Sequence, residues 1–512
     1  MHLSYRNQLL DGFFRRLQTH PDDTALLDTR GRAHTFVELF IQSETQRQHL
    51  VTQGFASGDR AVLLGVPSFE LFSFVIAVLR LGGVLVLADP GMGRDVFRSR
   101  MTASAPRWVY MDTTLRRVQR HPILRWFLAR RGAYIPSMND VPAARMLTTV
   151  ARQKLAMTIP DLQHVTSMTL DLPPLPTTQE QAIVFTSGTT AEPKGVAHTV
   201  GSLAASLELI QGFCSFSELS TVYTSLPYFL LIAIASGVRV QLSPRTFFAR
   251  KWKQDIDRGQ PTHIFSAPSE MNAVANLYKQ HGVCLPSSLR QIMLGSAPVT
   301  RPVLEHVLDR VDDKTAVTGI YGLTEMLPVA LVDGRRKLQT DTAGDLLGEL
   351  LPGVHGETAP DGELLVSAPH MSPHYLGQPD AKHIATGDVV TLHDRTVILV
   401  GRKKDMIIRG NFNIYPRLYE STIERMPGVA ACAMIGVWDE RQHDERVVLV
   451  VEPQPAYQLN LEAEVRKHLR QPAFSIDAVA LPDEILVMTL PRSGRQSKID
   501  KQKVRAMIST RS

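Results

Sequence analysis

The chain has 512 residues, of which 44% are hydrophobic and 21% are charged, and its formal net charge is +6. This length exceeds one hydrophobic core and predicts two to four domains, with the composition of a soluble globular protein. A transmembrane helix is excluded, because no uninterrupted apolar stretch reaches the length of about 18 residues that spanning requires.

The cysteines and the N-terminus indicate a compartment. Cys214, Cys284 and Cys432 are scattered and have no Cys-x-x-Cys spacing. We interpret all three as reduced core residues, which argues against a disulfide or zinc framework. Residues 1–20 carry charges every few positions and lack the apolar core of a signal peptide. Together these features predict a cytoplasmic protein.

The first predicted elements alternate between helix and strand. An amphipathic helix over 35–54 precedes a strand over 61–66, and the next helix leads into a strand over 84–89. The most apolar stretch, 71–89, contains Arg80 and a glycine pair, so we interpret it as helix, turn and buried strand. This βαβ order predicts a parallel sheet with helices on its faces.

An arginine-rich segment follows at 115–134, with the sequence LRRVQRHPILRWFLARRGAY. It holds six arginines with apolar residues between them. One interpretation is a pair of surface helices. The other is a patch for peripheral contact with anionic lipid headgroups or with an acidic partner. We expect no nucleic-acid binding, because no recognised module accompanies the patch.

Segment 185–199 is rich in small hydrogen-bond donors and reads FTSGTTAEPKGVAHT. We expect a strand before it and a helix N-terminus after its turn, an arrangement whose backbone N–H groups bind phosphate oxygens. Lys194 adds a positive charge. The residues that form the donor-rich turn are Thr186, Ser187, Gly188, Thr189 and Thr190. The segment is not a Walker P-loop, because Pro193 stands where that motif needs glycine.

Strand-like segments continue to the C-terminus. Short apolar runs ending in Ser, Gly or Pro occur at 221–227, 238–242, 262–268 and 291–298. From about Gly344 short strands alternate with turns, and a compact α+β segment follows Gly401. We therefore predict a large domain over 1–401 and a small one over 402–512.

The motif SGTTAEPKG resembles the phosphate loop S-G-T-T-G-x-P-K-G of the adenylate-forming superfamily, with Ala191 in place of one glycine. That superfamily includes acyl-CoA synthetases, luciferases and peptide-synthetase adenylation domains. The resemblance implies an α/β fold. Its large domain would have stacked, mostly parallel sheets with helices and a small β-barrel-like subdomain, and its small α+β domain would be mobile.

Further motifs match the superfamily in order, from about residue 35 to 499. GSAP resembles the segment that lines adenine, formed here by Gly295, Ser296, Ala297 and Pro298. YGLTE resembles a signature whose aromatic residue, here Tyr321, stacks on adenine and is followed by a glycine, here Gly322. In that signature the threonine, here Thr324, contacts the α-phosphate and the glutamate, here Glu325, holds Mg²⁺.

Three later motifs complete the match. TGD resembles the segment whose aspartate, here Asp388, accepts from the ribose hydroxyls. In GRKKDMIIRGNFNIYP, Arg402 matches a ribose contact and Lys404 the hinge between domains. PRSGRQSKI resembles the C-terminal lysine loop, with Lys498 as the catalytic lysine. It departs from the pattern because Ser497 replaces glycine and the loop is one residue longer.

The resemblance implies an AMP-forming acid ligase that uses ATP and Mg²⁺. The enzyme would convert a carboxylic acid to an acyl-adenylate and release pyrophosphate. Two anions must meet in this step, so positioning and charge neutralisation dominate the catalysis. Lys498 would bridge the carboxylate and the α-phosphate, and the 186–194 loop would bind the outer phosphates.

The acid and the acyl acceptor remain open at this point. Members often carry a histidine near the acyl pocket, and here Tyr228 and Phe229 are followed by Leu230 at that position. An apolar wall for a fatty or β-hydroxy fatty acid and a simple buried helix start are equal alternatives. The acceptor would be coenzyme A or the phosphopantetheine of a carrier protein.

Short segments also resemble one subgroup, the β-lactone synthetases of bacterial olefin biosynthesis. These segments are DPGMGR and the residues around Glu325 and Lys498. In that subgroup the substrate's own β-hydroxyl displaces AMP, so no coenzyme A is needed. A non-catalytic adenylate-binding scaffold is a further alternative, opposed by the joint presence of Lys194, Glu325, Asp388 and Lys498.

Overall fold

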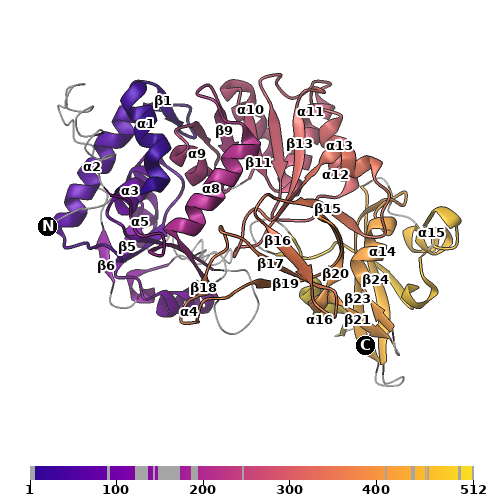
Figure 1. The fold of residues 1–512 in the computed structure, drawn as a ribbon. Coiled ribbons are helices and arrows are strands. Elements are labelled where there is room, and N and C mark those ends of the chain that lie inside the picture. Colours follow the sequence, from indigo (N-terminus) through magenta and orange to yellow (C-terminus); the bar gives the residue numbers. More distant parts are fainter. Residues whose placement is uncertain are drawn as a thin grey trace.

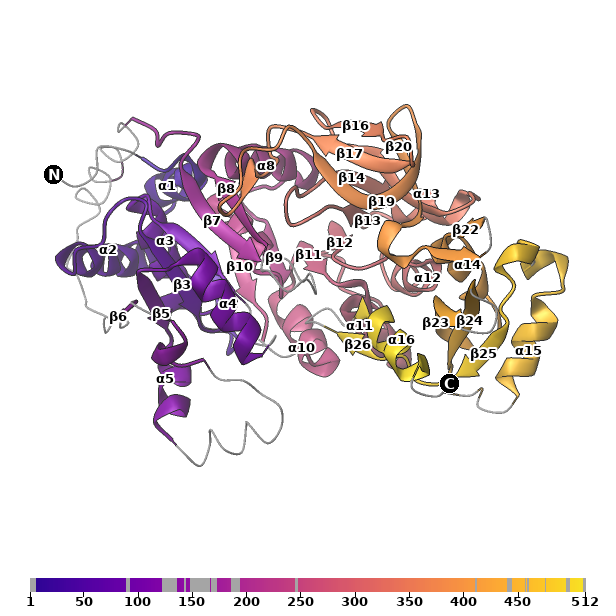
Figure 2. The ribbon, with the colours of Figure 1, turned by 90° about the horizontal axis from the view of Figure 1, so that it is seen from below.

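The computed structural model places two large sheets and their helices before a smaller C-terminal region (Figure 1). It describes residues 6–88, 93–121, 136–141, 144–147, 166, 173–185, 194–244, 247–409, 412–439, 444–455, 457, 460–474, 476–493 and 498–509. The predicted α/β fold is confirmed. Figure 2 shows the C-terminal region at the opposite end of the molecule from the helix α2 (Phe36–Thr52).

The larger sheet has thirteen described strands and changes character halfway. Its parallel half has apolar strands buried on both faces, as parallel sheets require. These strands are β13 (Ala316–Tyr321), β12 (Gln291–Leu294), β11 (His263–Ser266), β9 (Thr221–Thr224), β10 (Arg239–Leu242) and β1 (Thr24–Leu27), with the antiparallel β2 (Ala33–Thr35) at the edge.

Antiparallel strands continue this sheet from β13. They are β14 (Ala330–Asp333), β15 (Asp345–Leu350), β20 (Thr396–Arg402), β19 (Ile384–His393), β17 (Glu363–Ser367) and β16 (His355–Thr358). They correspond to the region where the sequence predicts a small barrel-like subdomain. In the structure they are hydrogen-bonded to the parallel strands as one continuous sheet.

The second sheet has seven described strands and carries the N-terminal βαβ units. Its order is β18 (His374–Tyr375), β8 (Gly195–Thr199), β7 (Glu180–Phe185), β4 (Val84–Leu87), β3 (Arg60–Leu64), β5 (Trp108–Met111) and β6 (Arg145–Leu147). The pairs β3–β4 and β3–β5 are parallel, as predicted, whereas β8 is antiparallel to β7.

An apolar helical layer joins the two sheets. It contains α1 (Asp11–Thr19), α2, α3 (Phe69–Arg80), α8 (Val200–Cys214) and α9 (Pro227–Ala235). Helix α2 begins at a capping box, in which the Thr35 hydroxyl accepts from the Glu38 N–H and the Glu38 carboxylate accepts from the Thr35 N–H. Helix α3 is apolar on most sides because it is buried in this layer.

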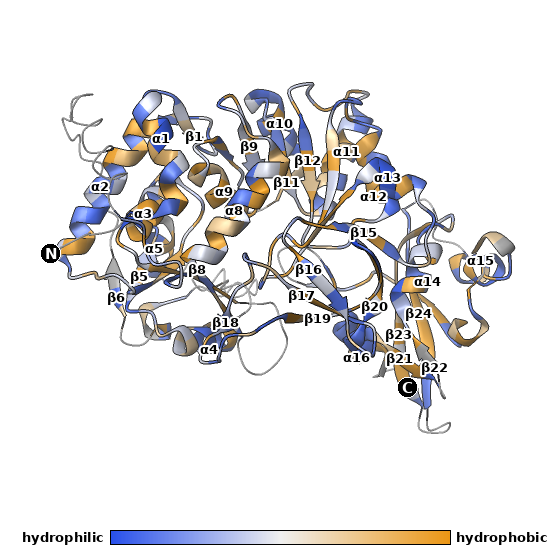
Figure 3. Cartoon of the chain, in the orientation of Figure 1, coloured by the Kyte–Doolittle hydropathy of each residue, from blue (hydrophilic) through white to orange (hydrophobic). Residues whose placement is uncertain are grey.

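Other helices cover the outer faces. They are α4 (Arg94–Ser104), α5 (Thr113–Arg120), α10 (Ala249–Gly259), α11 (Pro268–Gln280), α12 (Arg301–Leu308) and α13 (Gly334–Gln339), with short 3₁₀ turns at Gln8–Leu10 and Met138–Asp140. Figure 3 shows hydrophilic residues on α10 and α13 and hydrophobic residues on the strands that they cover. No helix in the described ranges is long and apolar enough to cross a membrane.

The cysteines and the arginine-rich segment match their sequence interpretations only in part. Cys214 and Cys432 are buried and free, as expected, but Cys284 is exposed, so its interpretation as a core residue is wrong. It lies in the loop after α11, where Val283 is exposed as well and only the next apolar residue, Leu285, reaches the core. Of the arginine-rich segment, the structure describes the part in α5 and His121, and residues 122–134 lie outside the described ranges.

The C-terminal region begins with a short 3₁₀ turn, Lys403–Asp405. Its strands are β21 (Ile407–Arg409), β22 (Phe412–Ile414), β23 (Val429–Asp439), β24 (Asp444–Pro453), β25 (Glu484–Val487), β26 (Arg492–Ser493) and β27 (Lys498–Ile499). Its helices are α14 (Pro416–Ile423), α15 (Leu461–His468) and α16 (Lys501–Ser509), with 3₁₀ turns at Pro472–Phe474 and Ala478–Ala480. This is the α+β segment that the sequence predicts.

A buried ionic cluster fixes this region against the larger sheet. A carboxylate oxygen of Asp345, on β15, lies 2.7 Å from Lys337 Nζ. Its other carboxylate oxygen lies 3.5 Å from a guanidinium nitrogen of Arg417, on α14. Burial alone would raise the pKa of Asp345, but the two positive charges outweigh it and hold that pKa below its usual value. The carboxylate therefore stays charged and ties α14 to β15.

We predict that Asp345→Ala lowers the free energy of unfolding by about 3 kcal/mol, because it leaves the buried Lys337 without its anion and Arg417 with Glu424 alone. Urea unfolding measures this loss. Glu349→Ala on the same strand is the matched control, since the Glu349–Arg336 pair is 54–56% exposed and contributes about 1 kcal/mol or less. Equal losses in the two variants would contradict the prediction.

The loop at 322–329 after β13 is anchored through its carbonyl groups. His198 Nε2, on β8, donates to the Thr324 carbonyl at 2.9 Å, and the Ser372 N–H donates to the Glu325 carbonyl at 2.8 Å. The Ser206 hydroxyl donates to the Leu327 carbonyl, and His370 Nε2 donates to the Pro328 carbonyl at 2.6 Å. The second sheet and α8 thus hold a loop of the first sheet.

His198 makes this anchoring sensitive to acid. Burial lowers its pKa to about 4, although the bond to the Thr324 carbonyl acts in the opposite direction. The unfolded chain takes up a proton near pH 6.5, so between pH 6.5 and 4 the unfolded state binds more protons than the folded state. The contribution of His198 to stability is therefore present above pH 6.5 and is lost as the pH falls toward 4.

We predict that His198→Gln, which keeps an N–H donor, reduces the loss of stability between pH 6.5 and 4 by up to about 3 kcal/mol. Urea unfolding at several pH values measures the slope for both proteins, and the comparison at pH 8 isolates any change in packing. Parallel pH profiles for wild type and variant would show that His198 does not contribute.

Candidate functional site

The predicted adenine-binding residues lie at the carboxyl ends of adjacent parallel strands. Gly295 follows β12, and its N–H donates to the Ser266 carbonyl at the end of β11 at 3.2 Å. Tyr321 ends β13, which pairs with β12. Ligands of open α/β sheets bind beyond such strand ends. The order of the strands thus brings two motifs, 26 positions apart, to one edge.

Two backbone features shape this edge. Ser296 has a φ of +68° and is exposed, a left-handed conformation that residues other than glycine seldom adopt. Gly322 has no room for a side chain, because a Cβ there would lie 2.5 Å from Leu327 Cδ1. Ala297 and Pro298 complete the turn before α12.

Asp388 is the centre of a polar group at the same edge. Its side chain is 2% exposed, and Tyr321 Oη donates to one carboxylate oxygen at 2.8 Å. Arg402 Nε lies 2.8 Å from the other oxygen, and strand pairing places Arg402 directly opposite Asp388. Burial, and then the nearby carboxylate, raise the pKa of Tyr321 well above its usual value, so the phenol remains a donor.

Lys498 approaches this group from the C-terminal region, on the β26–β27 hairpin. The residue as a whole is exposed, but partial desolvation of its ammonium group lowers its pKa. The charges of Arg402 and Lys404 lower that pKa further, and Asp388 opposes them. Lys498 thus lies within electrostatic reach of two cations, Arg402 and Lys404, and of one carboxylate, Asp388, and the excess positive charge favours an anionic ligand.

Glu325 and Lys194 lie on either side of Tyr375. Tyr375 Oη donates to Glu325 Oε1 at 2.7 Å, and Lys194 Nζ lies 5.8 Å from the centroid of the Tyr375 ring. Thr324 precedes Glu325 in the loop that His198 anchors. The structure therefore brings together the ends of two motifs that the sequence separates by about 130 positions.

The donor set around Glu325 fits a magnesium ion that enters with ATP. The described residues contain no group of three or more His, Cys, Asp or Glu side chains that could hold a metal by themselves. Mg²⁺ is commonly bound by one or two carboxylates together with substrate phosphates and water. One carboxylate beside a lysine at the end of the phosphate loop has that chemistry.

The phosphate loop itself lies mostly outside the described ranges. This applies to Thr186, Ser187, Gly188, Thr189 and Thr190. Its two ends are described, and Phe185 pairs with Gly195 in the antiparallel β7–β8 ladder. The strand expected before the segment is β7 and the helix expected after it is α8, which begins at Val200, but the strand β8 lies between the turn and this helix. The residues GVAHT form β8, which pairs with β7, and all five are buried in the sheet.

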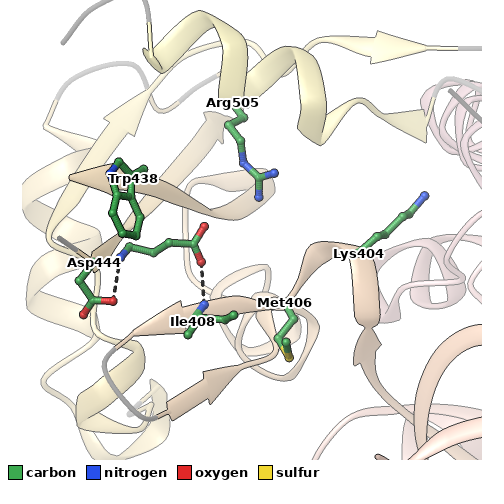
Figure 4. A pocket seen from close by; sticks show the side chains of 7 residues that line it. Lys404, Met406, Ile408, Trp438, Asp444 and Arg505 are labelled. Carbon is green, nitrogen blue, oxygen red and sulfur yellow. Dashed lines mark hydrogen bonds between the residues drawn. The ribbon is translucent and has the colours of Figure 1, made fainter. Parts of the chain in front are cut away.

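Lys404 lies in the turn between the two regions and is exposed. It also borders a pocket of about 310 Å³ in the C-terminal region, lined by Met406, Ile408, Trp438 and Arg505 among others. Figure 4 shows the Lys404 side chain pointing away from the other labelled residues. The pocket therefore includes the predicted hinge residue in its lining.

The predicted acyl-pocket residues lie on α9. Phe229 and Leu230 are buried in the helical layer, and the Phe229 ring stacks on Phe265 with centroids 4.1 Å apart. The Tyr228 hydroxyl contacts the Ser206 hydroxyl at 2.5 Å. These positions are those of a buried helix start, and a role in acyl binding stays a prediction.

Sequence reasoning missed His198 and Tyr375. Two nearby histidines, His370 and His374, have structural partners. In the structure His370 bonds to a backbone carbonyl, and His374 contacts Asp380 and Glu180. Neither residue has a signal near it in the sequence, since all five residues of β8 are buried and the pairing of β18 with β8 depends on tertiary structure.

Comparisons with known proteins agree with this geometry. A family model described as "AMP-binding enzyme" matches residues 13–376, and one described as "AMP-binding enzyme C-terminal domain" matches residues 418–496. A feruloyl-CoA synthase from Amycolatopsis sp is 27% identical over 471 residues, covering 87% of this chain and 89% of that protein. An olefin beta-lactone synthetase from Xanthomonas campestris is 24% identical, with 85% and 83% covered.

Solved structures share the fold. An amide bond synthetase from Marinactinospora thermotolerans superposes with a TM-score of 0.77 at 21% identity, covering 98% of this chain and 99% of that one. O-succinylbenzoate coenzyme A synthetase from Bacillus subtilis, in complex with ATP and magnesium ion, gives 0.75 at 19% identity, with the same coverage. Because the first family model alone matches more than half of the sequence, the chain belongs to the AMP-binding enzyme family and is an acid ligase that forms adenylates.

Proposed function

We propose that the enzyme activates a fatty or β-hydroxy fatty acid with ATP and transfers the acyl group to a thiol. The first step gives an acyl-adenylate and pyrophosphate, and the second gives a thioester of coenzyme A or of a carrier protein. The observation that carries the first step is the convergence of Lys498 and Arg402 on Asp388, beside Tyr321.

The residues have distinct roles in this proposal. The carboxylate of Asp388 accepts from the ribose through lone pairs left free by Tyr321 and Arg402, since each carboxylate oxygen can accept more than one hydrogen bond. Lys498 draws the negative oxygens of the acid and of the α-phosphate together, which lowers the barrier for attack on phosphorus. Mg²⁺, when bound, neutralises part of the phosphate charge, and Glu325 is its protein ligand.

We also propose the boundary and hinge between the two domains. The strand β20 ends at Arg402, and the short turn at 403–405 connects it to the C-terminal region. We place the large domain at 1–401 and the small one at 402–512, with Lys404 at the hinge. Rotation there would carry Lys498 away from Asp388 once the adenylate has formed, and it would also separate Arg417 from Asp345.

The proposed substrate class rests on two supports. The run 226–237 is apolar throughout the helix α9, apart from its edges. Two olefin beta-lactone synthetases, 24% and 26% identical, are among the relatives, beside ligases named for aromatic acids such as 2-succinylbenzoate. The second candidate function is therefore a β-lactone synthetase, in which the β-hydroxyl of the substrate displaces AMP.

We propose a cytoplasmic enzyme whose partners are the acid, ATP and, for a thioester product, a thiol carrier. Peripheral contact with a membrane through 115–134 remains part of this proposal. Support comes from α5, whose basic residues Arg116, Arg117 and Arg120 lie in one helix. Long acids partition into membranes, so a basic surface there would bring the enzyme to its substrate.

We predict that Lys498→Ala lowers acid-dependent release of pyrophosphate by about 100-fold or more, the size expected for the loss of a main electrostatic stabiliser. A coupled pyrophosphate assay measures the rate. Lys503→Ala on α16 is the control, because Lys503 is 63% exposed and pairs with Asp500 at the surface. A folded Lys498→Ala enzyme with a near-normal rate would contradict the assignment.

Product analysis tests the acceptor. The enzyme is incubated with ATP and each of a panel of fatty, β-hydroxy fatty and aromatic acids, with and without coenzyme A, and mass spectrometry identifies the products. We expect a β-hydroxy or plain fatty acid to give AMP and a thioester when coenzyme A is present. A product lighter than the β-hydroxy acid by one water, formed without coenzyme A, would replace this by the β-lactone synthetase. Turnover of aromatic acids alone would overturn the substrate class.

A further inference from the structure

Tyr375 occupies the position between a cation and an anion at the phosphate end of the site. It ends the short strand β18, and backbone pairing with Val196 of β8 fixes its place beside Lys194. Its hydroxyl donates to Glu325 Oε1 at 2.7 Å, and Lys194 Nζ lies 5.8 Å from its ring centroid. One side chain thus contacts both charges.

The same three kinds of residue occur together elsewhere in the molecule with a different outcome. Tyr278 Oη donates to Asp257 Oδ1 at 2.5 Å, and Lys253 Nζ lies 4.4 Å from the Tyr278 ring centroid. There, Lys253 Nζ also forms a direct ion pair with Asp257 Oδ2 at 2.6 Å. This group, on α10 and α11, neutralises its own charges and is a structural element.

At Tyr375 the two charges do not pair. Within the described part of the chain no ion pair joins Lys194 to Glu325, and neither residue has another ionic partner. Opposite charges beside one tyrosine would lower their energy by direct contact, as Lys253 and Asp257 do. Lys253 and Asp257 lie four residues apart on one helix, whereas Lys194 and Glu325 come from separate segments, and Tyr375 holds Glu325 through its hydroxyl and faces the lysine with its ring.

The tyrosine is suited to hold that position. Burial, followed by its bond to Glu325, raises the pKa of the Tyr375 phenol, so the hydroxyl keeps its proton and remains a donor. The Glu325 carbonyl is fixed separately by the Ser372 N–H, three residues before Tyr375. Both the backbone and the side chain of Glu325 are therefore positioned from the 372–375 segment.

We propose that Tyr375 is a positioning residue that holds the Glu325 carboxylate through its hydroxyl and the Lys194 ammonium over its ring, so that the carboxylate is in place for Mg²⁺ and the ammonium for the phosphates of ATP. This inference rests on the proposed function, in which these two residues bind the metal and the nucleotide. It assigns Tyr375 a role through its neighbours, without contact to the reacting atoms.

The test measures binding. Titration of Mg²⁺ into the enzyme with a fluorescent ATP analogue gives the half-saturating Mg²⁺ concentration. Tyr375→Phe keeps the ring but removes the hydroxyl that holds Glu325, so this concentration should rise about tenfold, the size of one hydrogen bond to a charged group. The matched control Tyr278→Phe removes the corresponding hydroxyl from the structural group and should leave the Mg²⁺ midpoint unchanged.

A double-mutant cycle separates this role from a loss of packing. In a Glu325→Gln background the charge is absent, so Tyr375→Phe should then change nucleotide binding by less than about twofold. An unchanged midpoint in Tyr375→Phe, or the same tenfold shift in the Glu325→Gln background, would overturn the proposal. If thermal unfolding shows that Tyr375→Phe is not folded, Tyr375→Met is measured in the same way.

The outcome is independent of the acid. Nucleotide binding needs no carboxylic acid, so the proposal on Tyr375 can hold even where no acid yields pyrophosphate and the proposed function fails. Conversely, pyrophosphate release by the wild-type enzyme with an unchanged Mg²⁺ midpoint in Tyr375→Phe would reject the role of Tyr375 alone.

Discussion

The site depends on one buried carboxylate, that of Asp388, which is shared by three parts of the chain. Tyr321 reaches it from the parallel half of the sheet, Arg402 from the neighbouring antiparallel strand, and Lys498 from the C-terminal region. A buried carboxylate needs such partners to remain charged. The positive charges that keep this carboxylate ionised exceed its single negative charge. The excess positive charge in turn favours the binding of an anionic nucleotide.

The loop between Tyr321 and Val329 shows how the fold holds reactive groups without using them. Its carbonyls are bonded by side chains and backbone from β8, α8 and the segment before β18. Those bonds satisfy the backbone and leave the Thr324 and Glu325 side chains for other contacts. Rigid support from residues outside the site is the usual condition for accurate catalytic geometry.

The sequence predicted the parts of the site that lie in contiguous motifs. Tyr321, Asp388 and Arg402 were predicted from such motifs, and so was the succession of parallel strands from their apolar runs. It did not predict contacts made across the sheets, because the pairing of β18 with β8 depends on tertiary structure and leaves no local pattern. Tyr375 and His198 were missed for this reason. The helix expected after the phosphate turn begins only at Val200, because the residues before it form β8 and pair with β7. Pairing in the sheet there outweighs the local conformational preference of the sequence.

The pocket beside the hinge leaves one indole in contact with solvent. Trp438 is 55% exposed, whereas Trp108 and Trp252 are at most 1% exposed and Trp126 lies outside the described residues. Indole emission depends on the polarity of the surroundings, and the buried pair supplies a constant background. The chain therefore contains its own optical probe next to Lys404, and a Trp438→Phe variant identifies its signal. A rearrangement that changes the surroundings of Trp438 can then be followed in real time without an attached dye.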